Sequence, residues 1–551
     1  MKKILPIIAF SLFLMNNSLG QSFYRIDDYC FGTTKIEGLV KVFRIGDRFY
    51  LQGYSDCRKA EWDKSEDNCD TTFYGNLYNN SWTVCCDDNF NKIWDKTYGG
   101  NDWMIFTDAI LSHNQILVSG WTRNDSICSN YTNGKGSINN QDFIIYFIDN
   151  SGIKTNEIRL GSFLSEFECK LVETSDKGFL IAGTSTGNAS GDRSQNSWGL
   201  NDYWVIKLDS SGNKQWDNAL GGNNREQDIG GVLALDGNNY LIYGHTLSSS
   251  SGLVSGNSYG GYDGWLIKID YTGSRVWDKR YGGNGYDHIV KVLRLGSFYY
   301  LLGTTNSLPN GQGTTTHHGF GNTDIWLMKT DTNGNLLWET KYGASANDLG
   351  IDMIPNNYGG FFILGNINTS GNGSFPSGNY GSTDFVIMSI DTAGKLLAYD
   401  IYGANLQDEA SGLLAINDST LLLYGNSIVG TSNVKTCAGH LAPPPANNAF
   451  NTDYWVIKVG YATTTTSISQ IQNNITLKVQ PNPAHDQINI TGLLPATYLV
   501  NTFCLDGRLV MSSTYTSDLS LTLAIENLQS GMYMTSIKNE NINTTVRWVK
   551  E

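Results

Sequence analysis

The chain contains 551 residues and carries a formal net charge of −14, with 60 glycines, 30 tyrosines and 14 tryptophans. Its length is sufficient for two or more domains, and its acidic balance excludes a nucleic-acid-binding function, which requires a basic face. Many glycines and aromatic residues, with few charges, favour short strands joined by turns. Long helical patterns are missing between residues 22 and 460.

The N-terminus has the pattern of a secretory signal peptide. Lys2 and Lys3 precede an apolar run from Ile4 to Met15, and small residues at 18–20 form a cleavage site. The apolar run is too short to span a bilayer comfortably; a buried first strand is the alternative interpretation. We therefore predict that residues 1–20 are a signal peptide, that the chain is exported, and that no transmembrane segment remains after cleavage.

Nine cysteines in an exported chain permit disulfides but leave at least one thiol unpaired, unless it pairs between chains. Four of them cluster in the first repeat: Cys57, Cys69, Cys85 and Cys86. We predict a disulfide staple that ties the 57–69 insertion, with Cys86 as a core residue. A zinc site made of all four thiolates is the alternative, although the spacing lacks a paired CxxC pattern.

A repeat organises the chain between residues 21 and 460. An aromatic residue opens its third strand at spacings of 61, 61, 61, 61, 59 and 70 residues, at Trp82, Phe143, Trp204, Trp265, Trp326, Phe385 and Trp455. A fixed period indicates a repeat architecture. Gly, Asn and Asp turns divide the clearest copy, residues 223–283, into four predicted strands: Ile229–Leu235, Tyr240–His245, Gly264–Asp270 and Arg275–Tyr281. Four strands per unit, repeated radially, form a β-propeller.

The two ends of the repeat region complement each other. Each unit closes with an aromatic residue or Leu before Gly, and an extra copy of this tag, Phe31-Gly32, precedes the first complete unit. The last copy, Asp453–Val459, has a third strand but no fourth. We therefore predict that the segment 23–32 completes the last blade of a closed, seven-bladed ring, which removes exposed sheet edges.

The repeat resembles the bacterial seven-bladed β-propeller repeat. The matching residues are Asp263, the run from Trp265 to Asp270, Gly273, Tyr281-Gly282-Gly283, Asp287 and the run from Tyr299 to Gly303. The resemblance covers roughly residues 22–460 and implies the fold. It implies no activity, because that family has no single activity and a fold does not confer function.

One face of the predicted propeller carries long loops. The loops between second and third strands are rich in Gly, Ser and Asn, and they emerge beside the fourth-to-first connections: residues 184–200, 246–262, 304–322, 366–382 and 426–451. Loops on a rigid scaffold usually carry binding residues, so we expect any ligand on this face. Four loop aromatics are candidates for stacking on sugar rings, or else they pack against their own loops: Trp198, Tyr259, Tyr262 and Phe320.

Aspartates recur on the same face. One set precedes the third strands, at Asp142, Asp202, Asp263, Asp324, Asp384 and Asp453, and another precedes the first strands, at Asp228, Asp287, Asp348 and Asp408. If the first set forms a functional site, five of its residues are candidate Ca²⁺ ligands: Asp202, Asp263, Asp324, Asp384 and Asp453. As a structural feature, each Asp accepts backbone N–H bonds and locks its loop. Repetition in every blade favours the structural role, and we predict no other cofactor.

Features that differ between blades are few. They are His317-His318 in the fifth loop, Cys437 and His440 in the seventh, and the cysteine insertion in the first blade. Metalloprotease, serine hydrolase, P-loop and dinucleotide motifs are missing from the sequence. We therefore assign no catalytic residue.

After residue 460 the composition changes. We predict a linker at residues 461–474, then a small immunoglobulin-like β-sandwich at 475–551, because seven short strand patterns follow in about 75 residues.

This segment resembles the C-terminal sorting domain of the type IX secretion system of Bacteroidota. The motif residues are Pro481, Asn482, Pro483, Gly507, Gly531, Tyr533 and Lys550. The resemblance implies passage through the Sec system, contact with the type IX machinery, and release or attachment at the outer-membrane surface. A carbohydrate-binding or adhesive sandwich is the alternative.

Together, these patterns favour a secreted or cell-surface propeller that acts as a non-catalytic binding or adhesion module for glycan or protein. An extracellular glycan hydrolase or lyase is one alternative, and it requires an unequal cluster of acid and base around the channel. A structural component of a surface layer is another.

Overall fold

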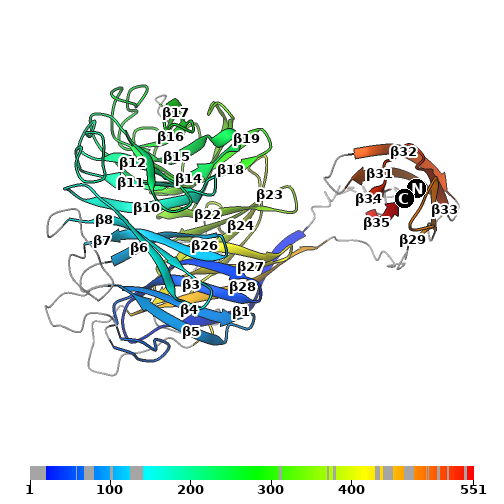
Figure 1. Ribbon diagram of the computed structural model, residues 1–551, viewed down its shortest axis with the longest axis horizontal. Coiled ribbons are helices and arrows are strands. Elements are labelled where there is room, and N and C mark those ends of the chain that lie inside the picture. The colour runs from blue at the N-terminus through cyan, green and yellow to red at the C-terminus, as the bar shows by residue number, and fades with distance from the viewer. Residues whose placement is uncertain are drawn as a thin grey trace, which may run out of the picture. The chain divides into compact units, whose positions relative to one another are not determined.

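The computed structural model describes residues 20–57, 59–67, 80–99, 104–123, 140–309, 313–368, 372–376, 380–428, 435–437, 451–464, 477–491, 493, 496–504, 509–517, 520–538 and 543–551. The chain divides into two compact units, residues 1–464 and 465–551 (Figure 1). Residues 1–19, which hold nearly all of the predicted signal peptide, lie outside the described part.

Within its described residues, the first unit consists of seven four-stranded antiparallel sheets, here numbered as blades 1 to 7. Each blade runs from its innermost to its outermost strand. Blade 1 holds β2 (Glu37–Ile45), β3 (Arg48–Ser55), β4 (Asn80–Asp87) and β5 (Lys92–Tyr98); blade 2 holds β6 (Met104–Ser112), β7 (Gln115–Thr122), β8 (Asp142–Ile148) and β9 (Lys154–Leu160); blade 3 holds β10 (Glu166–Glu173), β11 (Phe179–Ser185), β12 (Asp202–Leu208) and β13 (Lys214–Leu220).

The remaining blades follow the same order. Blade 4 holds β14 (Glu226–Ala234), β15 (Tyr240–Thr246), β16 (Asp263–Ile269) and β17 (Arg275–Tyr281), with the short 3-10 turn η1 (Asp236–Asn238); blade 5 holds β18 (Asp287–Leu295), β19 (Phe298–Thr305), β20 (Asp324–Asp331) and β21 (Leu336–Tyr342); blade 6 holds β22 (Asp348–Asn356), β23 (Gly360–Ile367), β24 (Asp384–Asp391) and β25 (Leu396–Tyr402); blade 7 holds β26 (Asp408–Asn417), β27 (Thr420–Ile428), β28 (Thr452–Thr464) and β1 (Gly20–Phe31).

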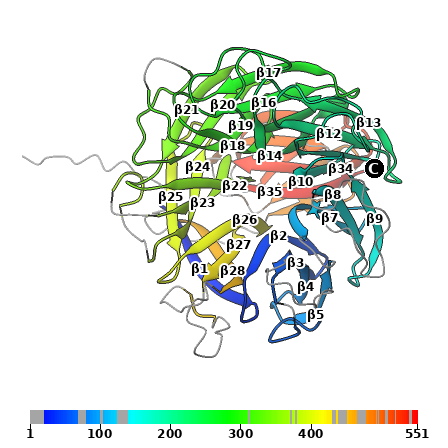
Figure 2. The ribbon, with the colours of Figure 1, turned by 90° about the vertical axis from the view of Figure 1, so that its left-hand side faces the viewer.

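The innermost strands form a closed ring. Each contacts the innermost strand of the next blade, from β2 through β6, β10, β14, β18 and β22 to β26, and β26 contacts β2 again. Figure 2 shows the sheets of this unit arranged around a common centre. The first unit is therefore a β-propeller, as the repeat predicts.

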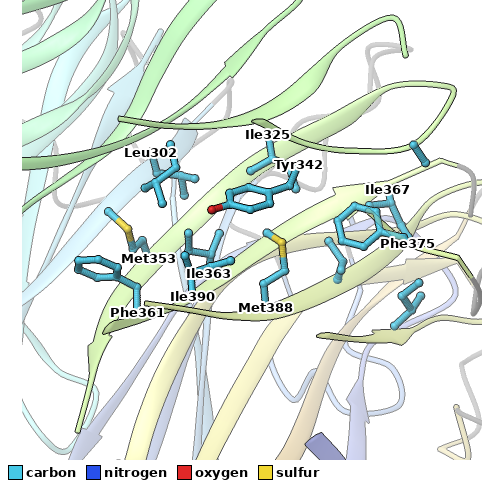
Figure 3. Packing of buried hydrophobic residues seen from close by; sticks show 14 of the residues in the cluster. Leu302, Ile325, Tyr342, Met353, Phe361, Ile363, Ile367, Phe375, Met388 and Ile390 are labelled. Atoms are coloured by element: carbon cyan, nitrogen blue, oxygen red, sulfur yellow. The ribbon is translucent and has the colours of Figure 1, made fainter. Parts of the chain in front are cut away.

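The blades are held together by apolar cores between neighbouring sheets. Figure 3 shows the core between blades 5 and 6, where Leu302, Ile325 and Tyr342 meet Met353 and Phe361. Every neighbouring pair, including blades 7 and 1, shares such a cluster. Because each sheet is covered on both faces, its middle strands are apolar on both sides. Burial of each such side chain stabilises the fold by roughly 1.5–3 kcal/mol.

The strand predicted to close the ring does so. β1 pairs antiparallel with β28, and in this register Phe23 faces Tyr461 and Tyr29 faces Val456. The pairing is longer than expected, because Gly20 pairs with Thr464. Residues 461–464 therefore belong to the propeller and not to a linker; β1 supplies partners for their backbone groups.

A tryptophan and a carboxylate join the two outer strands in five blades. In each, the indole Nε1 of the third strand donates to a carboxylate of the fourth: Trp82 to Asp95 (3.0 Å), Trp204 to Asp217 (2.9 Å), Trp265 to Asp278 (3.0 Å), Trp326 to Glu339 (2.6 Å) and Trp455 to Asp28 (3.1 Å). The same carboxylates accept backbone N–H bonds from the second-to-third loops, so they also fix the loop-bearing face. In blade 7 the carboxylate comes from the opposite end of the chain.

A disulfide joins Cys30 of β1 to Cys437, 407 residues later. The predicted staple is wrong, because Cys57 is a free buried thiol whose Sγ lies 3.1 Å from the carbonyl of Lys59; Cys69 lies outside the described residues. Cys86 is a core residue, as predicted. A four-thiolate zinc site does not form, because Cys85 and Cys86 enter different cores on opposite faces of β4.

Replacing Cys30 by serine removes this cross-link. We expect the free energy of unfolding of the propeller to fall by about 2–5 kcal/mol, because a long closed loop restricts the unfolded chain. Urea denaturation without reductant measures the change. As a control, dithiothreitol should lower the midpoint of the unmodified protein and leave that of Cys30→Ser unchanged. Equal midpoints for the two oxidised proteins would contradict the expectation.

The second unit is a small sandwich of two sheets. One sheet contains β29 (Lys478–Gln480), β30 (Gln487–Thr491) and β33 (Ser520–Ala524); the other contains β32 (Leu509–Ser517), β31 (Ala496–Cys504), β34 (Gly531–Lys538) and β35 (Asn543–Lys550). Side chains from both sheets, among them Ile488, Leu521, Tyr498 and Ile537, share one core. The number and order of these strands agree with the sequence prediction.

Candidate functional site

The innermost strands of the propeller line a hollow of about 890 Å³. Each innermost strand contains a β-bulge, where its pairing with the second strand is interrupted. The first residue that pairs again after the bulge lies at the same level of this channel in all seven strands. The seven residues are Lys41, Asp108, Lys170, Gly231, Lys291, Asp352 and Gly412. At the two glycines, the hydroxyl groups of Tyr243 and Tyr424 occupy the space that a Cβ would need.

The charges at this level compensate one another. Lys291 Nζ lies 2.7 Å from Asp352 Oδ1, and Lys170 Nζ donates to the carbonyl of Thr107 at 2.8 Å. Burial by itself lowers the pKa of Lys41, but Asp108 and Asp352 outweigh it and raise the pKa. Because these groups satisfy each other, we place the candidate ligand site at the end of the channel near the loops and not at this level.

Two carboxyl groups meet at that end. Glu168 lies on β10 and Asp228 on β14, each within a wide interruption of strand pairing. Both have left-handed backbone conformations, with φ of +57° and +49°, which are costly for residues other than glycine. The two side chains contact each other, and Glu168 Oε2 also accepts the backbone N–H of Ile229 at 3.0 Å. The bulges therefore direct two acidic side chains to one point.

Two histidines and two tyrosines surround this carboxyl pair. His245 Nε2 lies 3.7 Å from Asp228 Oδ2. The ring of His245 packs 4.4 Å from Tyr262, 5.3 Å from Tyr286 and 5.0 Å from His288, measured between ring centroids. The six residues Glu168, Asp228, His245, Tyr262, Tyr286 and His288 are called the mouth cluster.

Burial sets the protonation of the mouth cluster. Burial and contact with Asp228 raise the pKa of Glu168 to about 8. Burial lowers the pKa of His288 to about 4, and burial together with His288 lowers that of His245 to about 2. At neutral pH, Glu168 therefore holds a proton and both imidazoles are neutral.

A second hollow, of about 340 Å³, adjoins the mouth cluster through Tyr286, which lines both hollows. Its other lining residues are mostly neutral amides and hydroxyls: Thr304, Thr323, Asn347, Leu349, Asn366, Asn368, Thr383, Gln407 and Glu409. We call it the amide groove. These amides and hydroxyls carry little net charge. Some pair within the groove, as Thr383 does with Asn368 (3.1 Å) and Thr323 with Asn347 (3.3 Å), while Asn347 and Gln407 are exposed.

The five candidate calcium ligands lie in five different blades. Asp202, Asp263, Asp324, Asp384 and Asp453 are all buried, and each starts or nearly starts a third strand. The first four accept the backbone N–H of the residue four positions earlier, at 2.7–3.1 Å. A Cβ on the glycine of each closing tag would overlap these carboxylates, which explains the tag. Among the described residues, no group of three or more potential ligands is placed to hold a metal ion.

The second acidic set differs from the sequence prediction at one position. The carboxylates that accept the N–H of the fourth-to-first connections belong to Glu37, Glu166, Glu226, Asp287, Asp348 and Asp408. The sequence prediction assigned Asp228 to this set, but Glu226 holds the equivalent position: it accepts the N–H of Gly222, four residues earlier, at 2.9 Å, as Asp287 does from Gly283. Asp228 is therefore free to face the channel.

Other predicted residues have separate positions. Of the loop aromatics, Tyr262 enters the mouth cluster, whereas Trp198 and Phe320 are 52% and 45% exposed. His317 Nδ1 contacts Glu339 Oε1 at 3.0 Å, so it belongs to the tryptophan–carboxylate tie of its blade. Cys437 is in the disulfide, and His440 lies outside the described residues.

The sorting residues lie along the last strand of the second unit. Asn482 Oδ1 accepts the N–H of Val549 at 2.9 Å, and Lys550 Nζ donates to the carbonyl of His485. Gly531 pairs with Lys550, and the ring of Tyr533 stacks on Trp548 at 4.9 Å. Pro481 and Pro483 flank Asn482, and Gly507 lies outside the described residues. Motifs far apart in sequence therefore meet at the C-terminal strand.

Residues 478–551 match the model of the secretion system C-terminal sorting domain. The second unit is a type IX secretion sorting domain. The sorting domain indicates export to the cell surface or the extracellular space and interaction with the secretion machinery. The described part of the chain contains no helix able to span a membrane.

Solved structures similar to the chain share little sequence with it. They include the WD40 domain of Neurospora crassa Pan2 (8% identity, TM-score 0.41, covering 80% of this chain and 96% of that one). Others are a protein of unknown function from Dyadobacter fermentans (8%, 0.36, 80% and 99%) and the phage phi92 endosialidase (9%, 0.38, 96% and 87%). No curated protein matches the chain. Similarity at this level carries no argument about function.

Sequence reasoning missed the mouth cluster. One signal was available: the residue after the glycine of each second strand differs between blades, as Tyr54, Trp121, Thr184, His245, Thr304, Asn366 and Asn426. Unequal residues at one repeat position indicate a site that the fold itself does not require.

Buried carboxyl groups make the propeller sensitive to pH. Burial raises the pKa of Glu37 to about 8 and that of Glu226 to about 7, so the folded state binds more protons than the unfolded state between about pH 4.5 and these values. We expect the free energy of unfolding to fall as pH rises from 5 to 8. Glu226→Gln should reduce this slope by up to about 1.4 kcal/mol per pH unit.

Urea denaturation at pH 5, 6, 7 and 8 measures these slopes. Asp47→Asn, at an exposed position of the same unit, is the matched control and should leave the slope unchanged. A slope for Glu226→Gln equal to that of the unmodified protein would contradict the expectation.

Proposed function

We propose that this protein is a non-catalytic propeller that binds glycan at the loop-bearing end of its channel, outside the cell. The observation that carries this proposal is the amide groove next to the mouth cluster. Sugars present closely spaced hydroxyl groups, and side-chain amides and hydroxyls match them as donors and acceptors. A groove with many neutral polar groups and one acid, Glu409, suits a sugar chain better than an apolar or highly charged ligand.

Exposed aromatic rings support the same function. Trp198, Phe320 and Tyr380 occupy the same repeat position in blades 3, 5 and 6, each four residues before the buried aspartate, with exposed fractions of 52%, 45% and 42%. Aromatic faces bind the apolar faces of sugar rings while their edges remain in water. Because the repeat spaces these rings around the rim, the face suits an extended polymer with several contacts.

The carboxyl geometry favours binding over glycan hydrolysis. Glycosidases place their two carboxyl groups about 5–5.5 Å or 6.5–9.5 Å apart, depending on mechanism. Burial and the interaction with Asp228 instead raise the pKa of Glu168, which indicates a closer pair than either glycosidase arrangement. In this arrangement, the two carboxyl groups provide a binding surface.

The two ends of the chain carry the signals for the proposed export from the cell. We propose that residues 1–20 direct Sec export and are removed, and that residues 478–551 then direct passage across the outer membrane. An extracellular propeller with this tail is suited to adhesion or polymer capture at the cell surface.

A glycan array probed with the full chain tests the binding function. We expect selective binding of a subset of glycans, and a roughly tenfold loss of affinity for Asn347→Ala or Gln407→Ala, because each exposed amide contributes one or two hydrogen bonds worth about 1–1.5 kcal/mol. Asn333→Ala, in an exposed hairpin turn at the other end of the propeller, is the matched control and should bind normally.

Two outcomes would overturn this function. Binding to no glycan on the array would remove it, and release of shortened oligosaccharides from a bound polymer would replace it by an enzymatic one.

Deletion of residues 478–551 tests the export route. In a bacterium with type IX secretion, we expect the truncated chain to remain inside the outer membrane, because the sorting residues along β35 are removed. Immunoblots of periplasm, cell surface and medium measure the distribution. Equal amounts of intact and truncated chain outside the cell would contradict the assignment.

A further inference from the structure

The mouth cluster has an unusual set of hydrogen-bonding groups. His245 is fully buried, yet neither of its ring nitrogens has a hydrogen-bond partner among the described residues. The 3.7 Å between His245 Nε2 and Asp228 Oδ2 is too long for a hydrogen bond. Both ring nitrogens are closed to solvent, whereas Asp228 keeps 42% of its side chain exposed, so a ligand reaches this pair through Asp228. A buried polar group without a partner costs about 1–3 kcal/mol, so the neutral imidazole, with one donor and one acceptor nitrogen, occupies a costly position beside Asp228.

Acceptors dominate this cluster. Asp228 and Glu168 supply carboxyl oxygens, and neutral His245 supplies a ring nitrogen. Of these, Asp228 and Glu168 line the channel, and an ammonium group has three N–H donors for their carboxyl oxygens. The rings of Tyr262 and Tyr286 pack edge to face, 5.9 Å apart between centroids, and Tyr286 lines the channel with the two carboxyl groups. Aromatic rings attract cations.

An organic cation suits the cluster better than a metal ion. No group of three or more potential ligands among the described residues is placed to hold a metal, and aromatic rings are poor metal ligands. Asp228 keeps 42% of its side chain exposed, so the carboxyl pair is accessible from the mouth. Lys170, two residues after Glu168 on β10, donates to the carbonyl of Thr107 at 2.8 Å.

We propose that the mouth cluster binds the free amino group of a 2-amino-2-deoxyhexose unit within the glycan. This inference rests on the proposed glycan-binding function and names its specificity. The sugar chain lies in the amide groove, Tyr286 connects the groove with the channel, and the ammonium group meets Asp228 and Glu168, which line the channel together with Tyr286. His245 Nε2 lies 3.7 Å from Asp228 Oδ2. An N-acetylated amine has no positive charge and only one N–H, so it is a poor ligand.

Binding displaces a proton. Glu168 holds a proton at neutral pH, since its pKa is raised to about 8, and an adjacent ammonium group favours the carboxylate form. The titratable groups that face the site are Glu168, Asp228, His245, Tyr262, Tyr286, His288 and Lys170. Both imidazoles are neutral at this pH, so Glu168 is the proton donor.

Isothermal titration calorimetry of the full chain at pH 7 tests the proposal. The probes are a glucosamine tetrasaccharide with free amines and its fully N-acetylated counterpart. We expect at least tenfold tighter binding of the free amine, and proton release that appears as a dependence of the measured enthalpy on the ionisation enthalpy of the buffer. Asp228→Asn should weaken binding of the free amine about tenfold and leave binding of the N-acetylated sugar unchanged.

A matched variant separates local contact from overall charge. The chain has a net charge of −14, so a polycationic sugar experiences a general attraction. Asp236→Asn removes the same charge from the same blade at an exposed turn, and it should bind both probes normally. Thermal unfolding of both variants verifies that they are folded.

The outcomes separate the two proposals. Equal affinity of the unmodified protein for both probes, or equal effects of Asp228→Asn and Asp236→Asn, overturns the amine site and leaves glycan binding intact. Binding of neither probe also overturns the amine site, and the glycan array then decides glycan binding by itself. Selective, Asp228-dependent binding of the free amine supports both.

Discussion

The antiparallel pairing of β1 with β28 is the contact on which the propeller depends. It joins residues more than 400 positions apart, and without it blade 7 would expose an unpaired strand edge. Two further contacts fix the same junction: the hydrogen bond from Trp455 to Asp28 and the disulfide between Cys30 and Cys437. Closure in this way orders every inter-blade core, because each blade is covered on both faces only when the ring is complete.

The tie between tryptophan and carboxylate connects the scaffold with the loop-bearing face. The carboxylate that holds the indole also accepts backbone N–H bonds from the long loop, as Asp217 does with Ser194 (2.9 Å). The buried aspartates at the starts of the third strands anchor the other ends of these loops. Repeated acidic residues therefore give the face its shape, and they are not available as a shared metal site.

Function depends on departures from the repeat. Where the inner strands follow the common pattern, their charged residues meet at one level of the channel and compensate each other, as Lys291 and Asp352 do. Where β10 and β14 are interrupted, Glu168 and Asp228 adopt costly conformations beside two imidazoles. Among the described residues, neither ring nitrogen of His245 has a hydrogen-bond partner, nor does Nε2 of His288. Strain and unsatisfied polar groups at one place, on an otherwise self-consistent scaffold, are typical of a ligand site.

The sequence by itself determined the repeat, its four strands per unit, the strand that closes the ring and the sorting tail, because turn residues, strand periodicity and short motifs are local. It also indicated the role of the buried aspartates, through their recurrence in every blade. Only the tertiary structure decided that Asp228 faces Glu168, that Cys30 pairs with Cys437 and that Cys57 stays a thiol. These outcomes depend on the width of two bulges and on the packing of strands that are distant in sequence, and neighbouring residues do not encode either of them.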